Sequence, residues 1–226
     1  MLYPATYNRL NMSNLTPAAV SAYLGALRKE PHPQLAVIDR EGRAEGLPLV
    51  YPDTGALLHT LARASGARRI LEIGTAIGYS TLWMATALPD DGALITMEYD
   101  AARANRARDH FATAGFADRI SVIVGDATRF LHKVGGPFDV IFQDSDKKLY
   151  EPMLDRLIEL LRPGGLLIAD NILWNGEVIP GYVANKKYSE EDTAAIVSFS
   201  RRLSGDPRLY TSFLQVGDGV SVSVKL

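Results

Sequence analysis

The chain has 226 residues, of which 24 are lysine or arginine and 26 are aspartate or glutamate, so its formal net charge is −2. This balance speaks against a generally basic surface of the kind that binds nucleic acid or anionic lipid. No cysteine is present, which excludes disulfides, thiol nucleophiles and thiolate metal sites and leaves oxygen or histidine as metal ligands.

The sequence contains no run of about 18 apolar residues, which a membrane-spanning helix would need. Residues 1–24 lack the basic and apolar regions of a secretory signal, so we expect a cytoplasmic protein. The length suits one α/β domain with a large core. We expect residues 1–46 to form an N-terminal helical extension, with helices over 18–28 and 34–45, and residues 47–226 to form the main domain.

After the extension, the chain alternates between strand-like and helix-like stretches. Strands are predicted over 69–73, 93–97, 120–124, 138–142 and 166–169, and helices over 54–65, 79–88, 100–114, 149–161 and 189–203, with a short helix from Asp126. The strands are almost entirely apolar, which indicates a parallel sheet covered by helices on both faces. Residues 210–216 and 220–225 flank Gly217-Asp218-Gly219, a pattern that predicts an antiparallel hairpin.

A glycine turn follows the first predicted strand, within Glu72-Ile73-Gly74-Thr75-Ala76-Ile77-Gly78. It lacks both the G-x-G-x-x-G spacing of dinucleotide sites and the lysine of a Walker loop. Glu72 would repel pyrophosphate but suits the cationic amino-acid end of S-adenosylmethionine, and Glu98, at the end of the second strand, could bind ribose hydroxyls. Alternatively, Glu72 binds backbone amides and Glu98 is a solvated strand end. The two acids together favour the cofactor.

Acidic and amide side chains also follow the fourth and fifth predicted strands. In a right-handed doubly wound sheet these strands lie beside the first, so Asp144, Asp170 and Asn171 should meet near the glycine turn. Three oxygen ligands favour Mg²⁺ or Ca²⁺ over zinc. Alternatively, Asp170 caps a loop and Asn171 forms an Asx turn. A nearby cation would disfavour an ammonium ion, so Lys147 could act as a general base, whereas Lys148 could be an ordinary solvated charge.

These motifs resemble the cation-dependent O-methyltransferases, a family that includes catechol and caffeoyl-CoA O-methyltransferases. The resemblance covers about residues 45–226 and rests on LEIGTAIGYS, ITMEYD, FDVIFQDSDKKLY, LLRPGGLLIADNILWNGEV and QVGDGVSVSVK. It implies an α/β, Rossmann-like class I methyltransferase fold, with a mostly parallel seven-stranded sheet and a C-terminal antiparallel hairpin. It also implies a homodimer that uses S-adenosyl-L-methionine and Mg²⁺, with Ca²⁺ or Mn²⁺ as alternative ions.

The same resemblance implies the roles of particular residues. The metal ligands would be Asp144, Asp170 and Asn171, with Lys147 as the catalytic base and Lys147 and Trp174 on the substrate side. The cofactor would contact Val50, Tyr51, Glu72, Gly74, Thr75, Ala76, Gly78, Tyr79, Ser80, Glu98, Tyr99, Asp126, Ala127 and Asp144. Two residues depart from the family pattern. Gln143 replaces an apolar residue and Ser145 replaces an alanine, which could alter the bonding around the metal.

The expected reaction is methylation of one hydroxyl of a vicinal diol, such as a small phenolic catechol. The metal would bind both oxygens, Lys147 would accept the proton, and the oxygen would attack the sulfonium methyl. The alternative is a tRNA hydroxyuridine O-methyltransferase of the same fold, with a basic patch from Arg40, Arg43, Arg63, Arg68 and Arg69. The neutral net charge weighs against it. A non-catalytic cofactor-binding module or an oxidoreductase fits less well.

Overall fold

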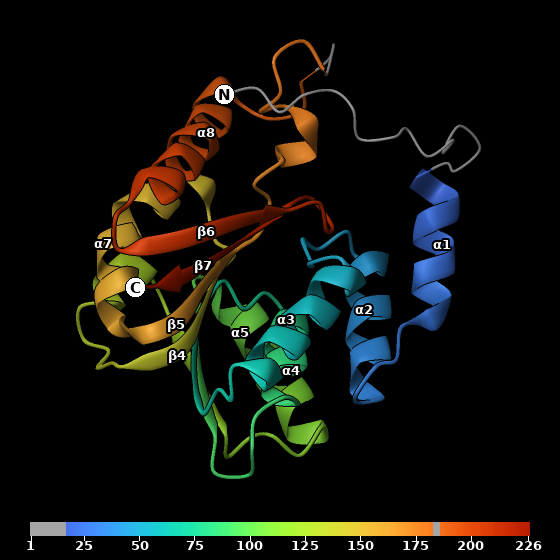
Figure 1. The fold of residues 1–226 in the computed structure, drawn as a ribbon. Helices are drawn as coiled ribbons and strands as arrows, with labels where there is room; N and C mark the ends of the chain where they lie inside the picture. The colour runs from blue at the N-terminus through green and yellow to red at the C-terminus, as the bar shows by residue number, and fades with distance from the viewer. Residues whose placement is uncertain (1–16, 183–185) are drawn as a thin grey trace.

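The computed structural model describes residues 17–182 and 186–226, in which seven strands form one sheet of order β3-β2-β1-β4-β5-β7-β6. The strands are β1 (Arg69–Ile73), β2 (Ala93–Glu98), β3 (Ile120–Val124), β4 (Phe138–Gln143), β5 (Leu161–Ala169), β6 (Leu209–Leu214) and β7 (Val220–Lys225). Strands β1 to β5 pair in parallel, whereas β7 runs antiparallel to both β5 and β6. The predicted mostly parallel, Rossmann-like sheet with a C-terminal antiparallel hairpin is confirmed (Figure 1).

Helices cover both faces of this sheet, as predicted. They are α1 (Pro17–Leu27), α2 (Gln34–Ala44), α3 (Pro52–Ala64), α4 (Tyr79–Ala85), α5 (Ala101–Thr113), α6 (Ala127–Phe130), α7 (Tyr150–Leu160) and α8 (Glu190–Gly205), with short 3₁₀ turns η1 (Lys147–Leu149) and η2 (Trp174–Gly176). Figure 1 shows α7 and α8 on one side of the sheet and α2 to α5 on the other.

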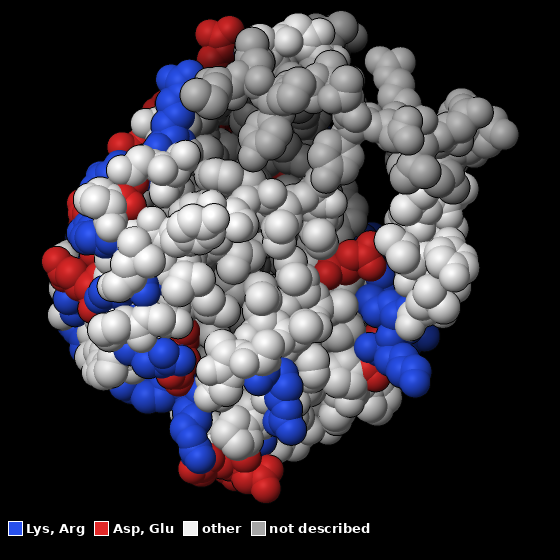
Figure 2. Space-filling view, viewed as in Figure 1, with Lys and Arg blue, Asp and Glu red and all other residues white. Residues whose placement is uncertain are grey.

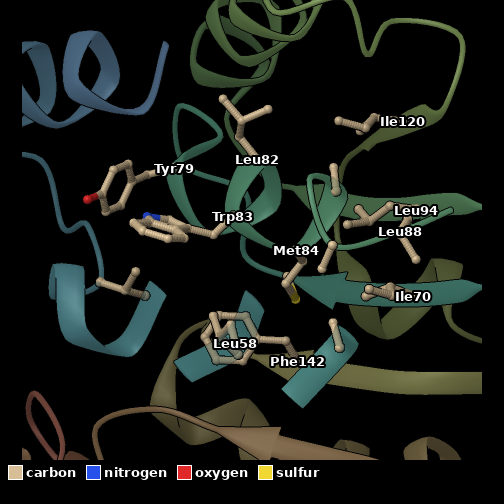
Figure 3. Packing of buried hydrophobic residues seen from close by; sticks show 14 of the residues in the cluster. Leu58, Ile70, Tyr79, Leu82, Trp83, Met84, Leu88, Leu94, Ile120 and Phe142 are labelled. Atoms are coloured by element: carbon tan, nitrogen blue, oxygen red, sulfur yellow. The ribbon is translucent and has the colours of Figure 1, made fainter. Parts of the chain in front are cut away.

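The alternation of side chains along the strands produces two hydrophobic clusters, one on each face. In β1, Ile70 faces the α2–α5 side, where it belongs to the same cluster as Leu58 and Trp83, whereas Leu71 faces the α7–α8 side. Figure 3 shows the first cluster. All of these side chains are buried. Burial of one such side chain contributes about 1.5–3 kcal/mol, so the two clusters account for much of the fold's stability.

The two N-terminal helices differ in how they are packed. In α2, Leu35 and Ile38 are fully buried and belong to the cluster on the α2–α5 face. In α1, residues 18–27 lack any buried side chain, and the helix lies at the edge of the molecule beside α2 (Figure 1). The helix predicted over 34–45 is therefore packed into the core of the domain, whereas the helix predicted over 18–28 is not. Residues 1–16 of the predicted extension lie outside the described residues.

Two predicted boundaries differ from the observed ones by more than two residues. The helix predicted over 79–88 ends at Ala85, and the strand predicted over 166–169 begins at Leu161. Leu161 is buried and pairs with Phe138 of β4, and the register then shifts before Val140 pairs with Leu166. The Pro-Gly-Gly segment that follows the helix predicted over 149–161 is thus an irregularity within β5, since the strand resumes its pairing with β4 beyond it.

Within residues 17–182 and 186–226, no helix is both long enough and apolar enough to cross a membrane.

Candidate active site

The carboxyl ends of β1, β2, β4 and β5 open into one cavity of about 1180 Å³. Its wall also includes residues 46–51, which precede α3, and Asp218 in the turn between β6 and β7. Open α/β sheets bind ligands at this edge. The volume exceeds the roughly 300–1,000 Å³ of a typical single-ligand pocket, so the cavity has room for a cofactor and a second molecule.

Most of the predicted site residues line this cavity, although they come from positions more than 100 residues apart. They are Val50, Tyr51, Gly74, Thr75, Ala76, Tyr79, Ser80, Glu98, Tyr99, Asp126, Ala127, Asp144, Lys147, Asp170, Asn171 and Trp174. Two predicted residues, Glu72 and Gly78, are not on its wall. The roles assigned to single residues stay predictions, but the predicted juxtaposition of the glycine turn with the ends of β4 and β5 is present.

Glu72 lies beneath the glycine turn and is completely buried. Its Oε1 accepts a hydrogen bond from Ser80 at 2.6 Å, and its Oε2 accepts bonds from Thr81 at 2.5 Å and from Thr96 at 2.6 Å. The carboxylate thus ties the start of α4 to β2 through three hydroxyl groups, and not through the backbone amides that we considered. Direct contact between Glu72 and the cofactor stays a prediction that this position does not favour.

The burial of Glu72 gives the protein a testable pH dependence. Burial raises the pKa of Glu72 to about 7 from an ordinary value of 4.5, although the three hydroxyl groups act to lower it. Between these values the folded protein binds more protons than the unfolded chain, so its stability falls as pH rises through this window. We expect the unfolding free energy of Glu72→Gln, relative to that of the wild type, to rise by up to about 3 kcal/mol as the pH is raised from about 5 to about 8.

Denaturant unfolding at the two pH values measures this gain. Glu190→Gln is the matched control, because Glu190 is an exposed residue in the first turn of α8. Parallel pH profiles of stability for the wild type and Glu72→Gln would contradict the assignment.

Glu98 and Gly78 shape the cofactor side of the site in different ways. The two carboxylate oxygens of Glu98 accept bonds from the amides of Ala76 at 2.8 Å and Asp100 at 3.0 Å. A carboxylate has about four acceptor positions, so Glu98 can still accept from a ligand.

At Gly78, φ is 94°, and a Cβ would lie 2.5 Å from the ring of Phe111. Gly78 is therefore needed for close packing of α4 against α5.

Asp144, Asp170 and Asn171 form a set of oxygen donors that fits a divalent cation. Asp170 is 1% exposed, and its Oδ1 has no hydrogen-bond partner in the described part of the chain. Burial and the neighbouring Asp144 raise the pKa of Asp170 above its ordinary value. Asp170 is buried and Asp144 is half-buried, and their mutual repulsion as anions is reduced when a cation binds to both. Carboxylate and amide oxygens suit Mg²⁺ or Ca²⁺.

Asn171 contributes an amide oxygen to this set. Among the described residues, no three histidine, cysteine, aspartate or glutamate side chains group together as a metal site. A site built from the predicted ligands would combine two carboxylates with one amide oxygen, and these three ligands stay a prediction.

The two adjacent lysines have different surroundings. Lys147 is 8% exposed, and its Nζ donates to Asp144 Oδ1 at 3.0 Å and to the buried Tyr150 hydroxyl at 2.8 Å. The side chain of Lys148 is 44% exposed and pairs with Glu191 at 2.8 Å. The sequence pattern barely distinguished these residues. Because Lys147 is held beside the proposed metal ligands, it is the better candidate for the base.

An aromatic pair forms another part of the cavity wall. The rings of Trp174 and Tyr188 are stacked, with centroids 3.8 Å apart and an interplanar angle of 27°. The Nζ of Lys147 lies 5.7 Å from the Trp174 ring centroid. Tyr188 was not predicted as a site residue, because it lies in an irregular segment without a motif. The available signal was its nearness in the sequence to Trp174, which was predicted to lie on the substrate side.

The arginines considered for a tRNA-binding patch mostly have partners. Arg43 pairs with Asp39 at 2.8 Å, and Arg68 forms an ion pair with Asp91. Arg69 donates to backbone carbonyls at 2.8 and 3.0 Å. On the face shown in Figure 2, basic and acidic residues are interspersed near the edge, and the centre is largely uncharged. These contacts do not favour a nucleic-acid surface.

Comparison with known proteins agrees with this geometry. The model of the O-methyltransferase family matches residues 41–226. The chain is 37% identical to a catechol O-methyltransferase of Niastella koreensis, covering 74% of this chain and 79% of that protein. It is 36% identical to caffeoyl-CoA O-methyltransferase 1 of Eucalyptus globulus, covering 75% and 72%. The crystal structure of an O-methyltransferase from Bacillus cereus with bound SAH superposes with a TM-score of 0.81 at 31% identity, covering 92% and 97%.

Proposed function

Because the chain belongs to the O-methyltransferase family and is an S-adenosylmethionine-dependent O-methyltransferase, we propose that its acceptor is a vicinal diol on an aromatic ring. The acceptor class is a catechol-type phenol, and the reaction depends on a divalent cation, with Mg²⁺ as the first candidate. One hydroxyl receives the methyl group and the neighbouring hydroxyl stays free.

The observation that carries this proposal is the unpartnered Oδ1 of Asp170. It belongs to a buried carboxyl at the end of β5, and it shares the cavity wall with Asp144, Asn171 and Lys147. A buried carboxylate oxygen without a hydrogen-bond donor is costly unless the group is protonated or a cation neutralises it. Such a donor set leaves ligand positions for two adjacent oxygens of an acceptor.

The residues of the cavity supply the remaining chemistry. S-adenosylmethionine provides an electrophilic methyl group, and a bound divalent cation would acidify and orient the hydroxyl. Lys147, as the neutral amine, would accept the hydroxyl proton at Nζ, which hydrogen bonds to Asp144 and the Tyr150 hydroxyl hold beside the donor set. Much of the rate enhancement then comes from the orientation of the acceptor against the cavity wall.

The stacked rings of Trp174 and Tyr188 support an aromatic acceptor. A planar ring can pack against such a surface. Two of the relatives described above are named for catechol and caffeoyl-CoA. Their names agree with a phenolic diol as the acceptor class.

Removal of the metal tests the proposal. With catechol and S-adenosylmethionine, we expect EDTA to abolish methyl transfer and added Mg²⁺, Mn²⁺ or Ca²⁺ to restore it to different degrees. Resorcinol, whose hydroxyls are not adjacent, should be methylated poorly at the same metal concentration, because it cannot present two oxygens to one cation.

Methyl transfer is measured by mass spectrometry of the products. Binding of S-adenosylhomocysteine, measured by calorimetry with and without EDTA, shows whether the fold remains intact. Full activity in EDTA, with the metal content verified as negligible, would contradict the proposed role of the metal.

A further inference from the structure

The turn between β6 and β7 reaches the cavity through Asp218, a residue to which the proposed reaction assigns no role. Its backbone carbonyl accepts a hydrogen bond from the amide of Leu173 at 3.0 Å. Leu173 follows the proposed metal ligand Asn171 by two residues. The turn is therefore fixed against the segment that carries this ligand.

The two carboxylate oxygens of Asp218 have different partners. Oδ1 accepts a hydrogen bond from the backbone amide of Asn175 at 2.7 Å, and Oδ2 accepts a longer one from Nδ2 of Asn171 at 3.4 Å. Within the described part of the chain, no group donates a hydrogen bond to Oδ1 of Asn171. Asn171 also has a φ of 59°, a left-handed conformation that its surroundings must maintain.

The chemistry of these groups decides how the amide of Asn171 is oriented. An ionised carboxylate can only accept hydrogen bonds, so it must face the NH₂ group of an amide and not the carbonyl oxygen. The oxygen of Asn171 is consequently turned away from Asp218. A divalent cation binds amide oxygens and does not bind the NH₂ group, so this orientation is the one that a metal site needs.

We propose that Asp218 is the positioning residue that orients the Asn171 amide, so that its oxygen is available to a divalent cation in the cavity. This inference rests on the proposed function, in which Asn171 is a metal ligand. Through Oδ1, Asp218 also holds the backbone of the turn that carries Trp174, and it thus links the metal side of the cavity to its aromatic side.

The Asp218→Asn variant separates amide orientation from anchoring of the loop. Its single side-chain oxygen can still accept the short bond from the Asn175 amide, so the loop stays anchored. Its NH₂ group then faces Asn171 and requires the oxygen of that amide as an acceptor, which withdraws the oxygen from the cation. A purely structural role for Asp218 would therefore tolerate this substitution.

Binding of Mn²⁺ to the metal-free, full-length protein, saturated with S-adenosylhomocysteine, is measured by electron paramagnetic resonance of the free ion. We expect Asp218→Asn to weaken Mn²⁺ binding about tenfold or more, the range seen when a partner of a metal ligand is changed. Its melting temperature should stay within about 4 °C of the wild type, which corresponds to roughly 1 kcal/mol for a chain of this size.

Asp192→Asn is the matched control, because it removes another carboxylate charge from the cavity wall. Asp192 bonds to Ser189 and not to a proposed metal ligand, so Mn²⁺ affinity should change by no more than about twofold. Wild-type affinity in Asp218→Asn, or an equal loss in Asp192→Asn, would overturn the inference. A wild-type protein that binds no Mn²⁺ would instead overturn the metal role in the proposed function, and the inference would fall with it.

Discussion

Replacing Lys147 by arginine or alanine is expected to lower kcat for catechol methylation by about 10²- to 10⁴-fold, the usual contribution of a general base. Lys147 is the buried lysine whose Nζ lies 3.0 Å from Asp144 and 2.8 Å from the Tyr150 hydroxyl. Arginine keeps a positive charge and can still donate to Asp144. Because its guanidinium does not give up its proton at neutral pH, it cannot accept one from the acceptor hydroxyl.

The comparison of the two Lys147 variants distinguishes a base from an electrostatic support. If Lys147 only neutralises Asp144, Lys147→Arg should retain most of the activity and Lys147→Ala should lose it. Initial rates at saturating catechol, S-adenosylmethionine and Mg²⁺ decide between these cases. KM for S-adenosylmethionine should change little, because the proposed role of Lys147 lies on the acceptor side.

Lys148→Ala is the matched control for this experiment. Lys148 is the adjacent residue, but it is exposed and pairs with Glu191 at 2.8 Å, so its removal should lower kcat by less than about threefold. Equal effects of Lys147→Ala and Lys148→Ala would overturn the choice of base. Thermal unfolding of each variant shows whether a loss of activity comes from a loss of fold.

The Gly74→Ala variant should lose both stability and cofactor binding. Gly74 has a φ of 103°, and a Cβ there would lie 2.1 Å from the backbone oxygen of Asp144. The backbone must therefore shift at the glycine turn and at a proposed metal ligand together. We expect the unfolding free energy to fall by at least about 3 kcal/mol, and the Kd for S-adenosylhomocysteine to rise at least about tenfold.

Gly66→Ala separates this steric effect from the cost of a left-handed backbone. Gly66 has a φ of 64°, close to the end of α3, and a Cβ there meets no atom within 4 Å. This variant should lose only about 1–2 kcal/mol and keep its affinity for S-adenosylhomocysteine. Denaturant unfolding and calorimetry measure the two quantities. If both variants behave alike, the close approach of Gly74 to Asp144 has no consequence for the site.

The strand-and-helix pattern of the sequence was sufficient to predict the fold, because most of its elements have a clear local signal. Apolar runs identified β1 and β3 over their observed residues, and Asp126 was recognised as the cap of α6. The start of β5 was missed, since proline and glycine normally end an element, whereas here the strand continues past an irregularity. Pairing with β4 decides that boundary, and pairing is not a local property.

In the candidate site, too, some features have a local sequence signal and others depend on contacts between distant segments. Sequence pattern alone located Asp144, Asp170 and Asn171 at neighbouring strand ends, because strand order follows from the connection rules of parallel sheets. It did not show that Glu72 lies below the cavity with three hydroxyl partners, or that Tyr188 stacks on Trp174. The predicted metal dependence, homodimer and cytoplasmic location stay predictions.

What the sequence determined by itself is the succession of strands and helices along the chain, the glycine turn after β1 and the residue types at the strand ends. These depend on local propensity and on hydrophobic periodicity, which neighbouring residues carry. What only the tertiary structure decided is which polar groups are buried and what they face. Lys147 differs from Lys148, and Asp218 acquires a partner in Asn171, through contacts between segments far apart in the chain. Burial and hydrogen bonding of this kind arise only once the sheet and its loops have packed together.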